Sequence, residues 1–274
     1  MARVPAIPVL LLIMTSSPAT AALTTTFQQS GTIGIEIAAV AGNNLPATSG
    51  TLTINTIPPG AIIVRATVHA SEINNPVSLN LTFAGNSVGP LGGPASDAAF
   101  LTMYQYKWDV TPYVTPSPNN YSFVVGQAVP ASNQIAVVAL VIVWQHPSEP
   151  NRTIAIIDGM KQVGESGAET ESVVFSSLPA GPTVAWVVTS GDDNAASGET
   201  VSYNGSNIGG PLDQGLGFSA SMLQMGTTSN SGSNTMAITT GLDHMGWMIA
   251  AVKVTPTVTP TRPSSWGRIK ALYQ

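Results

Sequence analysis

Alternation of apolar and polar residues predicts β-strands along most of this chain. In residues 61–71 (AIIVRATVHAS) every second position is apolar, and the same period of two recurs in residues 77–83 and 104–110. A period of two is typical of strands with one buried face. Residues 135–144 (IAVVALVIVW) are apolar throughout, which predicts a central strand covered on both faces. These patterns favour an all-β fold.

Two halves of the chain share an ordered set of motifs. Residues 83–91 read FAGNSVGPL and residues 203–212 read YNGSNIGGPL, with their final leucines 121 positions apart. The turns IPPG (57–60) and LPAG (178–181) are separated by the same offset, and each half closes on an apolar strand. This order predicts an internal duplication of a unit about 100 residues long, the size of one β-sandwich. Within it, Gly85 and Gly205 are expected to occupy tight turns with positive φ.

The ends of the chain are built differently from the body. Arg3, an apolar stretch over residues 4–14 and the small residues 19–21 (ATA) are typical of a signal peptide. The apolar stretch is too short to span a bilayer. A Pro/Thr-rich stretch (TPTVTPTRPSS) precedes the C-terminal WGRIKALYQ, whose apolar residues share one face of a short helix. The predicted organisation is a signal peptide (1–21), an N-terminal segment (22–50), sandwich unit 1 (51–150), a connecting strand and loop (151–170), sandwich unit 2 (171–254), a linker (255–265) and an amphipathic tail (266–274).

The number of charged residues and the absence of cysteine exclude several classes of function. Only 8% of the residues are charged, against about 25% in an ordinary soluble domain. The net charge of −5 argues against nucleic acid as a partner. The absence of cysteine excludes disulfides, zinc–thiolate sites and thiol nucleophiles. Abundant Ser, Thr, Asn, Gly and Pro instead indicate a secreted β-protein with uncharged polar faces.

Three stretches resemble a known family. They are DVTPYV (109–114), NYSFVV (120–125) and VALVIVWQHPSEPNRTIAIIDG (138–159). Their order is similar to that in a family of uncharacterised secreted β-rich domains of bacteria and archaea. The resemblance implies a jelly-roll-like surface protein with no known activity, so it assigns no catalytic residue. Taken with the repeat, we expect two tandem jelly-roll-like β-sandwiches and a short C-terminal helix.

The polar inventory offers little for catalysis. The three histidines, His69, His146 and His244, lack the i, i+4 spacing of helical zinc ligands, and alternation places His69 on a solvent-facing strand face. There is no G-x-S-x-G motif. Glycoside hydrolysis needs two carboxylates across a cleft. The candidates are Glu36, Glu72, Glu149 and Asp158, and the sequence does not indicate which two of them would lie together. We expect a protein that is not an enzyme and has no cofactor other than a candidate calcium ion.

The calcium hypothesis rests on one loop. Asp192, Asp193 and Asn194, with Glu199, place oxygen-bearing side chains close together in the sequence, and calcium accepts oxygen ligands from flexible loops. The same residues are also ordinary turn formers.

A row of aromatic residues gives a candidate ligand platform. Tyr104, Tyr106 and Trp108 share one strand face, where sugar rings could stack on them. The alternative is that the row belongs to the sandwich core. The first interpretation leads to a carbohydrate-binding module with surface glycans as partners.

The N-terminal segment suggests self-assembly. Residues 22–40 are strand-like, charge-poor and outside both repeats, so they could add a strand to a neighbouring copy through Phe27, Ile33, Ile35 and Ile37. The leading hypothesis is therefore a secreted, non-enzymatic structural or cell-surface protein, such as a filament or surface-layer subunit or an adhesin. Its expected partner is itself, with no membrane span. The alternative is a carbohydrate-binding module, with or without a calcium ion.

Overall fold

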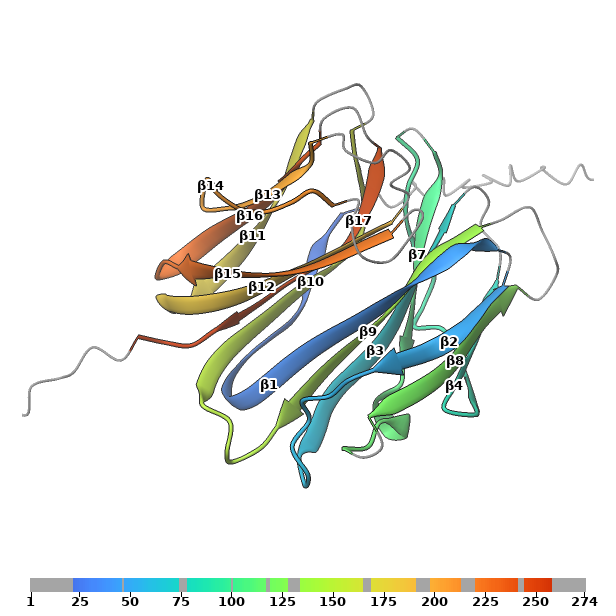
Figure 1. Ribbon diagram of the computed structural model, residues 1–274, viewed down its shortest axis with the longest axis horizontal. Coiled ribbons are helices and arrows are strands. Elements are labelled where there is room, and N and C mark those ends of the chain that lie inside the picture. The colour runs from blue at the N-terminus through green and yellow to red at the C-terminus, as the bar shows by residue number, and fades with distance from the viewer. Residues whose placement is uncertain are drawn as a thin grey trace, which may run out of the picture.

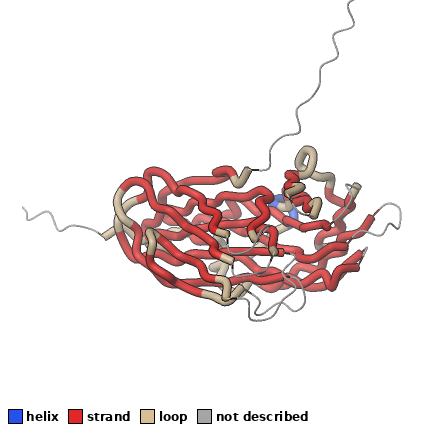
Figure 2. Tube along the Cα trace, turned by 90° about the horizontal axis from the view of Figure 1, so that it is seen from above, coloured by secondary structure: helices blue, strands red, loops and turns tan. Residues whose placement is uncertain are grey.

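The computed structural model describes residues 22–45, 47–73, 78–99, 101–116, 119–127, 134–164, 169–190, 198–212, 220–240 and 244–257. These residues form an all-β protein, as the alternation predicted. Their single helical element is the 3-10 turn η1 (Thr111–Tyr113), and Figure 2 shows strands through the rest of the body. The strands are β1 (Thr24–Leu45), β2 (Ala47–Thr53), β3 (Ile62–Ile73), β4 (Leu79–Phe83), β5 (Asn86–Val88), β6 (Ala95–Asp97), β7 (Met103–Asp109), β8 (Asn120–Gln127), β9 (Gln134–Gln145), β10 (Asn151–Val163), β11 (Thr170–Leu178), β12 (Gly181–Ser190), β13 (Thr200–Tyr203), β14 (Ser206–Gly209), β15 (Ala220–Ser229), β16 (Gly232–Thr239) and β17 (Met245–Val254).

A nine-stranded sheet organises the molecule around β1 (Figure 1). Its order is β15-β12-β17-β10-β1-β9-β3-β7-β6. The first part of β1, from Thr24 to Thr32, pairs with β10, and the second part, from Ile33 to Leu45, pairs with β9. Strand β1 therefore joins an N-terminal half-sheet (β9-β3-β7-β6) to a C-terminal half-sheet (β10-β17-β12-β15).

Two four-stranded outer sheets cover the half-sheets. The N-terminal outer sheet has the order β2-β8-β4-β5 and the C-terminal outer sheet the order β11-β16-β13-β14, and they lie at opposite ends of the view in Figure 1. Core clusters fill the space under each. Trp108 and Phe123 belong to the N-terminal cluster, and Trp247 and Phe175 to the C-terminal one. Each outer sheet thus forms a sandwich with the half-sheet beneath it.

A third core cluster packs the two half-sheets against each other. It combines Val137 and Val141 of β9 with Ile156 of β10, Val188 of β12 and Ile249 of β17. Strand β9 contributes its other face, including Leu140, to the N-terminal cluster. The prediction of a central strand covered on both faces is confirmed, and its uninterrupted apolar sequence follows from having protein on both sides.

The repeated glycine motifs form matching turns. Ala84-Gly85 joins β4 to β5 and Asn204-Gly205 joins β13 to β14. All four residues have positive φ, between 47° and 80°, which is the backbone of a two-residue type I′ hairpin turn. Glycine at the second position avoids the steric cost that a β-carbon would bring there.

The N-terminal segment corrects one expectation. Strand β1 does not lie outside the body: it occupies the centre of the nine-stranded sheet, and Ile33, Ile35 and Ile37 are at most 4% exposed. Phe27 is half-buried. The three isoleucine side chains therefore pack within the protein. Assembly by strand addition through this segment stays a prediction. The predicted signal peptide (1–21) and C-terminal helix (266–274) lie outside the described residues.

Candidate functional site

The most concentrated group of charges lies between the two half-sheets. Asp158 of β10 accepts a hydrogen bond from Lys107 of β7 at 2.8 Å and one from Thr26 of β1 at 2.5 Å. Arg65 of β3 approaches the same carboxylate at 3.7 Å. Only 4% of the Asp158 side chain is exposed, whereas about a fifth of each cation is. This ion cluster ties four strands together from both half-sheets.

His69 extends the ion cluster into the interior and corrects the sequence interpretation. The side chain is fully buried rather than solvent-facing, because the polar face of β3 packs against the C-terminal half-sheet. Its Nε2 atom bonds the Thr67 hydroxyl at 2.9 Å, and its Nδ1 atom has no hydrogen-bond partner among the described residues. Burial, and to a smaller extent the charges of Lys107 and Arg65, lower the pKa of His69 to about 4, although Asp158 opposes the shift. At neutral pH His69 is therefore uncharged.

Asp158 keeps its charge despite burial. Burial acts to raise its pKa, but the positive charge of His69 when protonated and the hydrogen bonds from Lys107 and Thr26 outweigh that effect. The pKa of Asp158 consequently lies below its ordinary value. Because His69 is neutral near pH 7, Lys107 and Arg65 are the cations that balance Asp158 there. The cluster is a satisfied ionic contact between half-sheets. A small cleft of about 170 Å³ reaches Lys107 and Asp158.

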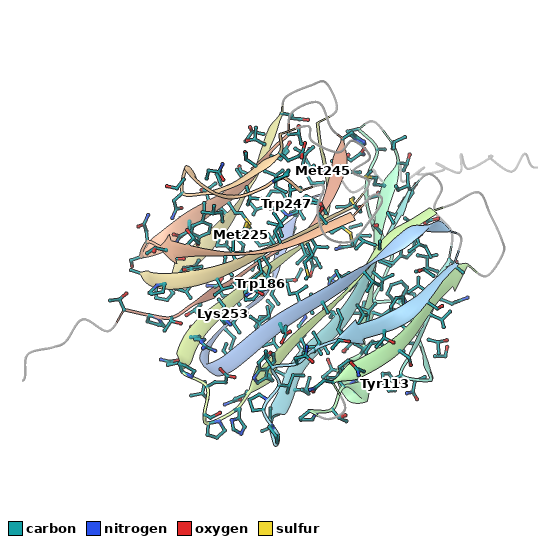
Figure 3. The ribbon with its side chains drawn as sticks, in the orientation of Figure 1. Tyr113, Trp186, Met225, Met245, Trp247 and Lys253 are labelled. Carbon is teal, nitrogen blue, oxygen red and sulfur yellow. The ribbon has the colours of Figure 1, made fainter. Side chains whose placement is uncertain are left out.

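A second polar cluster surrounds Lys253 of β17. Its ammonium lies over the Trp186 ring at 5.4 Å from the centroid, and Figure 3 labels both residues. Burial and the charge of Arg152 lower the pKa of Lys253, while Glu149 and Glu36 act in the opposite direction. Glu149 also pairs with Arg152 at 2.5 Å and accepts a hydrogen bond from Trp144. The charges of two of the four carboxylates considered for glycoside hydrolysis thus act on the same lysine. Thr56 donates a hydrogen bond to Glu36.

The outer sheets contain almost no charge. None of the strands β2, β8, β4 and β5 has a charged residue, and the C-terminal outer sheet has one, Glu171, which pairs with Lys161 of β10 at 3.2 Å. The outward positions are hydroxyls and amides, with Val124 and Val174 each about half exposed. The exposed hydroxyl and amide residues are Ser49, Thr51, Thr53, Asn80, Thr82, Asn86, Ser87, Asn120, Ser122, Thr170, Ser172, Ser176, Ser177, Ser206, Asn207, Ser233 and Thr235.

The aromatic row lies in the core. Tyr106 and Trp108 stack with ring centroids 6.1 Å apart and are 5% and 0% exposed. Tyr104 is partly buried against the same N-terminal cluster. The three residues share one strand face, as alternation predicted. Tyr106 and Trp108 are therefore too buried for a sugar ring to stack on them.

One open hollow reaches the edge of this row. A hollow of about 510 Å³ is lined by Tyr106, by Ser78 with Leu79 and Asn80 of β4, and by Pro90, Gly92, Gly93 and Pro94. The sequence did not single it out, since segments about 25 residues apart meet there. It combines an aromatic edge with polar groups at the surface.

The calcium residues are only partly described. Asp192, Asp193 and Asn194 lie outside the described residues, and Glu199 is buried at 1% exposure. Within the described part of the chain, no group of three or more His, Asp or Glu side chains is arranged to hold a metal ion. Calcium binding by this loop stays a prediction.

Sequence comparison places the chain in a family. Residues 19–255 match the family model described as "Protein of unknown function (DUF3344)". The chain belongs to this family. The resemblance to an uncharacterised family is thereby confirmed. A search of curated proteins finds no match. Among solved structures, the chain is similar to BpGH86A, a β-porphyranase of glycoside hydrolase family 86 from the human gut bacterium Bacteroides plebeius.

The similarity to BpGH86A is remote. The identity is 14% and the TM-score 0.27, with 89% of this chain and 38% of that chain covered. It carries no argument about activity. In the described part of this DUF3344 protein, no helix has the length and apolar character needed to cross a membrane.

Proposed function

We propose that this DUF3344 protein is a secreted, non-enzymatic structural or cell-surface protein that assembles with copies of itself through its charge-free outer sheets. One observation carries the proposal: eight outer strands contain a single charged residue, Glu171, and that residue is ion-paired to the inner sheet. Soluble proteins normally keep surfaces apart with charge, and edge strands carry lysine to prevent pairing. Surfaces without charge meet no such repulsion.

The proposed architecture is a tandem duplication of one jelly roll. The strand orders β1-β9-β3-β7 and β2-β8-β4-β5 in the first half correspond, strand by strand along the chain, to β10-β17-β12-β15 and β11-β16-β13-β14 in the second. Eight strands in two four-stranded sheets with this order are a jelly roll. The repeated turns at Gly85 and Gly205 support the same assignment. A duplicated body gives the molecule two similar outer faces on opposite sides.

Two opposed faces suit open assembly. If the N-terminal outer sheet of one copy contacts the C-terminal outer sheet of the next, the contact is heterologous and can propagate into a filament or layer. The charged groups of the described residues that would perform chemistry, such as Asp158 and Lys253, are instead engaged in internal contacts. This division between an ionic interior and an uncharged exterior supports a structural role.

The test is assembly by variants with charge on the outer faces. Val124→Lys on β8, an inner strand of one outer sheet, and Val174→Lys on β11, an edge strand of the other, each add a cation to an outer face without changing the core, because both side chains are about half exposed. We expect the wild-type protein to form oligomers or filaments in light scattering and electron microscopy, and each variant to form at least 10-fold less. Ile62→Lys is the matched control, since Ile62 is 68% exposed and lies on β3 of the nine-stranded sheet instead of on an outer sheet. Equal assembly by all four proteins would contradict the proposal.

A second candidate function is carbohydrate binding at the open hollow beside β4. The observation that favours it is the convergence of the Tyr106 edge, the Asn80 amide and the Pro90–Pro94 segment on one surface depression of about 510 Å³. Aromatic edges with a few polar groups are typical of ligand sites. The site differs from the predicted platform, because Trp108 takes no part in it.

Glycan-array binding tests this alternative. Asn80→Ala removes a polar group from the hollow while leaving β4 intact, and Ser122→Ala, on the same outer face but outside the hollow, is the control. Binding by the wild type and Ser122→Ala, lost in Asn80→Ala, would support carbohydrate recognition. No binding by the wild type would remove this candidate.

A further inference from the structure

Two clefts flank the side chain of Leu91 beside the ion cluster. The first is the small cleft of about 170 Å³ that reaches Lys107 and Asp158. The second has a volume of about 290 Å³ and is lined, besides Leu91, by Phe27, Val64, Arg65, Thr67, Asp109 and Thr111. Leu91 lines both clefts, so a ligand that occupied the two would cover its side chain.

Leu91 is exposed although its counterpart in the repeated motif is buried. The exposed fraction is 47% for Leu91 and 0% for Leu212. The Leu91 backbone N–H bonds the Lys107 carbonyl at 2.7 Å, which holds the residue beside β7. In the second cleft Leu91 joins the half-buried side chains of Phe27 and Val64. An exposed apolar surface that is hollowed on both sides is typical of a binding site.

The ion cluster next to Leu91 carries more positive than negative charge. Lys107 and Arg65 share one carboxylate, Asp158. His69 adds no charge at neutral pH, because its pKa is about 4. Only about a fifth of each cation's side chain is exposed. Charges removed from water are normally paired with opposite charges, so this cluster can accept one more anion.

The two cations also have unused hydrogen-bond donors. A lysine has three N–H groups and an arginine five. Among the described residues, Lys107 bonds only Asp158, and Arg65 contacts only Thr26 and Asp158 in this way. Lys107 lines the first cleft and Arg65 the second. Their remaining N–H groups favour a carboxylate, because hydrogen bonds between charged groups are the strong ones.

The second cleft restricts the ligand to a single negative charge. Asp109 is exposed and lines this cleft, where it would repel a second anionic group. Phe27 and Val64 give the cleft an apolar wall, and Arg65 lies over the Phe27 ring at 5.8 Å from its centroid. An apolar chain fits this wall better than a charged one.

We propose that the two clefts bind a monocarboxylate, with its carboxylate group at Lys107 and its apolar chain over Leu91 against Phe27. The ligand would supply the missing negative charge and cover the exposed leucine. This site is independent of the proposed assembly role, because the clefts lie along the nine-stranded sheet and not on the outer sheets.

Titration of the whole protein with hexanoate, followed by NMR signals of the ligand, tests the proposal. Hexanamide has the same chain without the charge, and hexanedioate has a second carboxylate at the far end. Leu91→Asp places a negative charge between the clefts, and Leu91→Asn is its uncharged counterpart. Val124→Asp is the matched control, since Val124 is 48% exposed and lies on an outer sheet. Melting curves without ligand verify folding.

We expect the wild type and Val124→Asp to bind hexanoate and not hexanamide. Leu91→Asp should bind hexanoate about 10-fold more weakly than Leu91→Asn, because of the added repulsion. Absence of hexanoate binding by the wild type would overturn the proposal. Equal binding of hexanamide, or unchanged binding by folded Leu91→Asp, would overturn it as well.

Asp109→Asn tests where the apolar chain lies without disturbing the ion cluster. Asparagine keeps an oxygen that can accept the hydrogen bond from the Thr111 backbone N–H. The wild type should bind hexanoate about threefold more tightly than hexanedioate, a modest preference because Asp109 is exposed. The variant should lose this preference. An equal preference in both proteins would overturn the placement of the chain in the second cleft.

Discussion

At the scale of single residues, the ion cluster between the half-sheets determines the response to acid. In the unfolded chain His69 gains a proton near its ordinary pKa of 6.5, but in the folded protein only near 4. Between these values the unfolded state binds more protons, so stability falls as the pH falls. Asp158 adds to the loss below its ordinary pKa, because its folded pKa is lowered and its contribution disappears as it is protonated.

The first prediction is that His69→Gln removes part of this acid sensitivity. Glutamine retains a polar group near the Thr67 hydroxyl but does not titrate. We expect the wild type to lose about 3 kcal/mol more unfolding free energy between pH 6.5 and 4 than the variant, as follows from 1.36 kcal/mol per pKa unit. Urea unfolding at a series of pH values measures it. His146→Gln, at the loop residue that bonds Ser148, is the control. Identical pH slopes in wild type and His69→Gln would refute the assignment.

The second prediction concerns Asp158. Asp158→Asn leaves Lys107 and Arg65 without their buried counter-charge, so we expect a loss of about 3 kcal/mol at neutral pH. This expected loss is at the low end of the range for buried ion pairs, because about a fifth of each cation's side chain is exposed to solvent. Urea unfolding measures the loss. Raising the salt concentration should change it little, since screening acts weakly on a buried carboxylate. A loss below about 0.5 kcal/mol would show that the cluster contributes nothing.

At the scale of elements, the repeated hairpin turns give a matched pair of tests. Gly85→Ala and Gly205→Ala place a β-carbon on residues with φ near 80°, where alanine is strained, so each should cost about 1 kcal/mol. Space does not limit either substitution, because no atom lies within 4 Å of the new carbon. Gly226→Ala in β15 is the control, also in open space but without a positive φ. Thermal unfolding compares the three; an equal effect in all would argue against the type I′ turns.

The sequence predicted individual elements well where one local pattern decided them. The apolar run of β9 and the glycine turns at 85 and 205 needed no distant partner to be recognised. His69 was misplaced because alternation separates two faces of a strand without saying what covers the polar one. The position of strand β1 was predicted wrongly for a related reason. Thr24 pairs with Asp158, more than 100 residues away, and no local sequence pattern indicates that pairing. The ion cluster was missed because four separate strands supply its members.

At the scale of the whole molecule, charge is distributed between interior and exterior in an unusual way. Ion pairs such as Lys107–Asp158 lie between the half-sheets, while the outer sheets present hydroxyls, amides and the two exposed valines Val124 and Val174. The two outer sheets cover different half-sheets and lie at opposite ends of the view in Figure 1. That arrangement, and not a catalytic pocket, is the basis for proposing an assembling surface protein.

The most direct test of this account is the molar mass of the purified protein by light scattering, over a range of protein and salt concentrations. Contacts between uncharged faces are not screened, so we predict oligomers or filaments whose mass grows with protein concentration and is unchanged between low and 1 M salt. A monomer at every concentration would contradict the central claim. Oligomers that dissociate at high salt concentration would contradict it as well, since ion pairs between the copies would then hold them together.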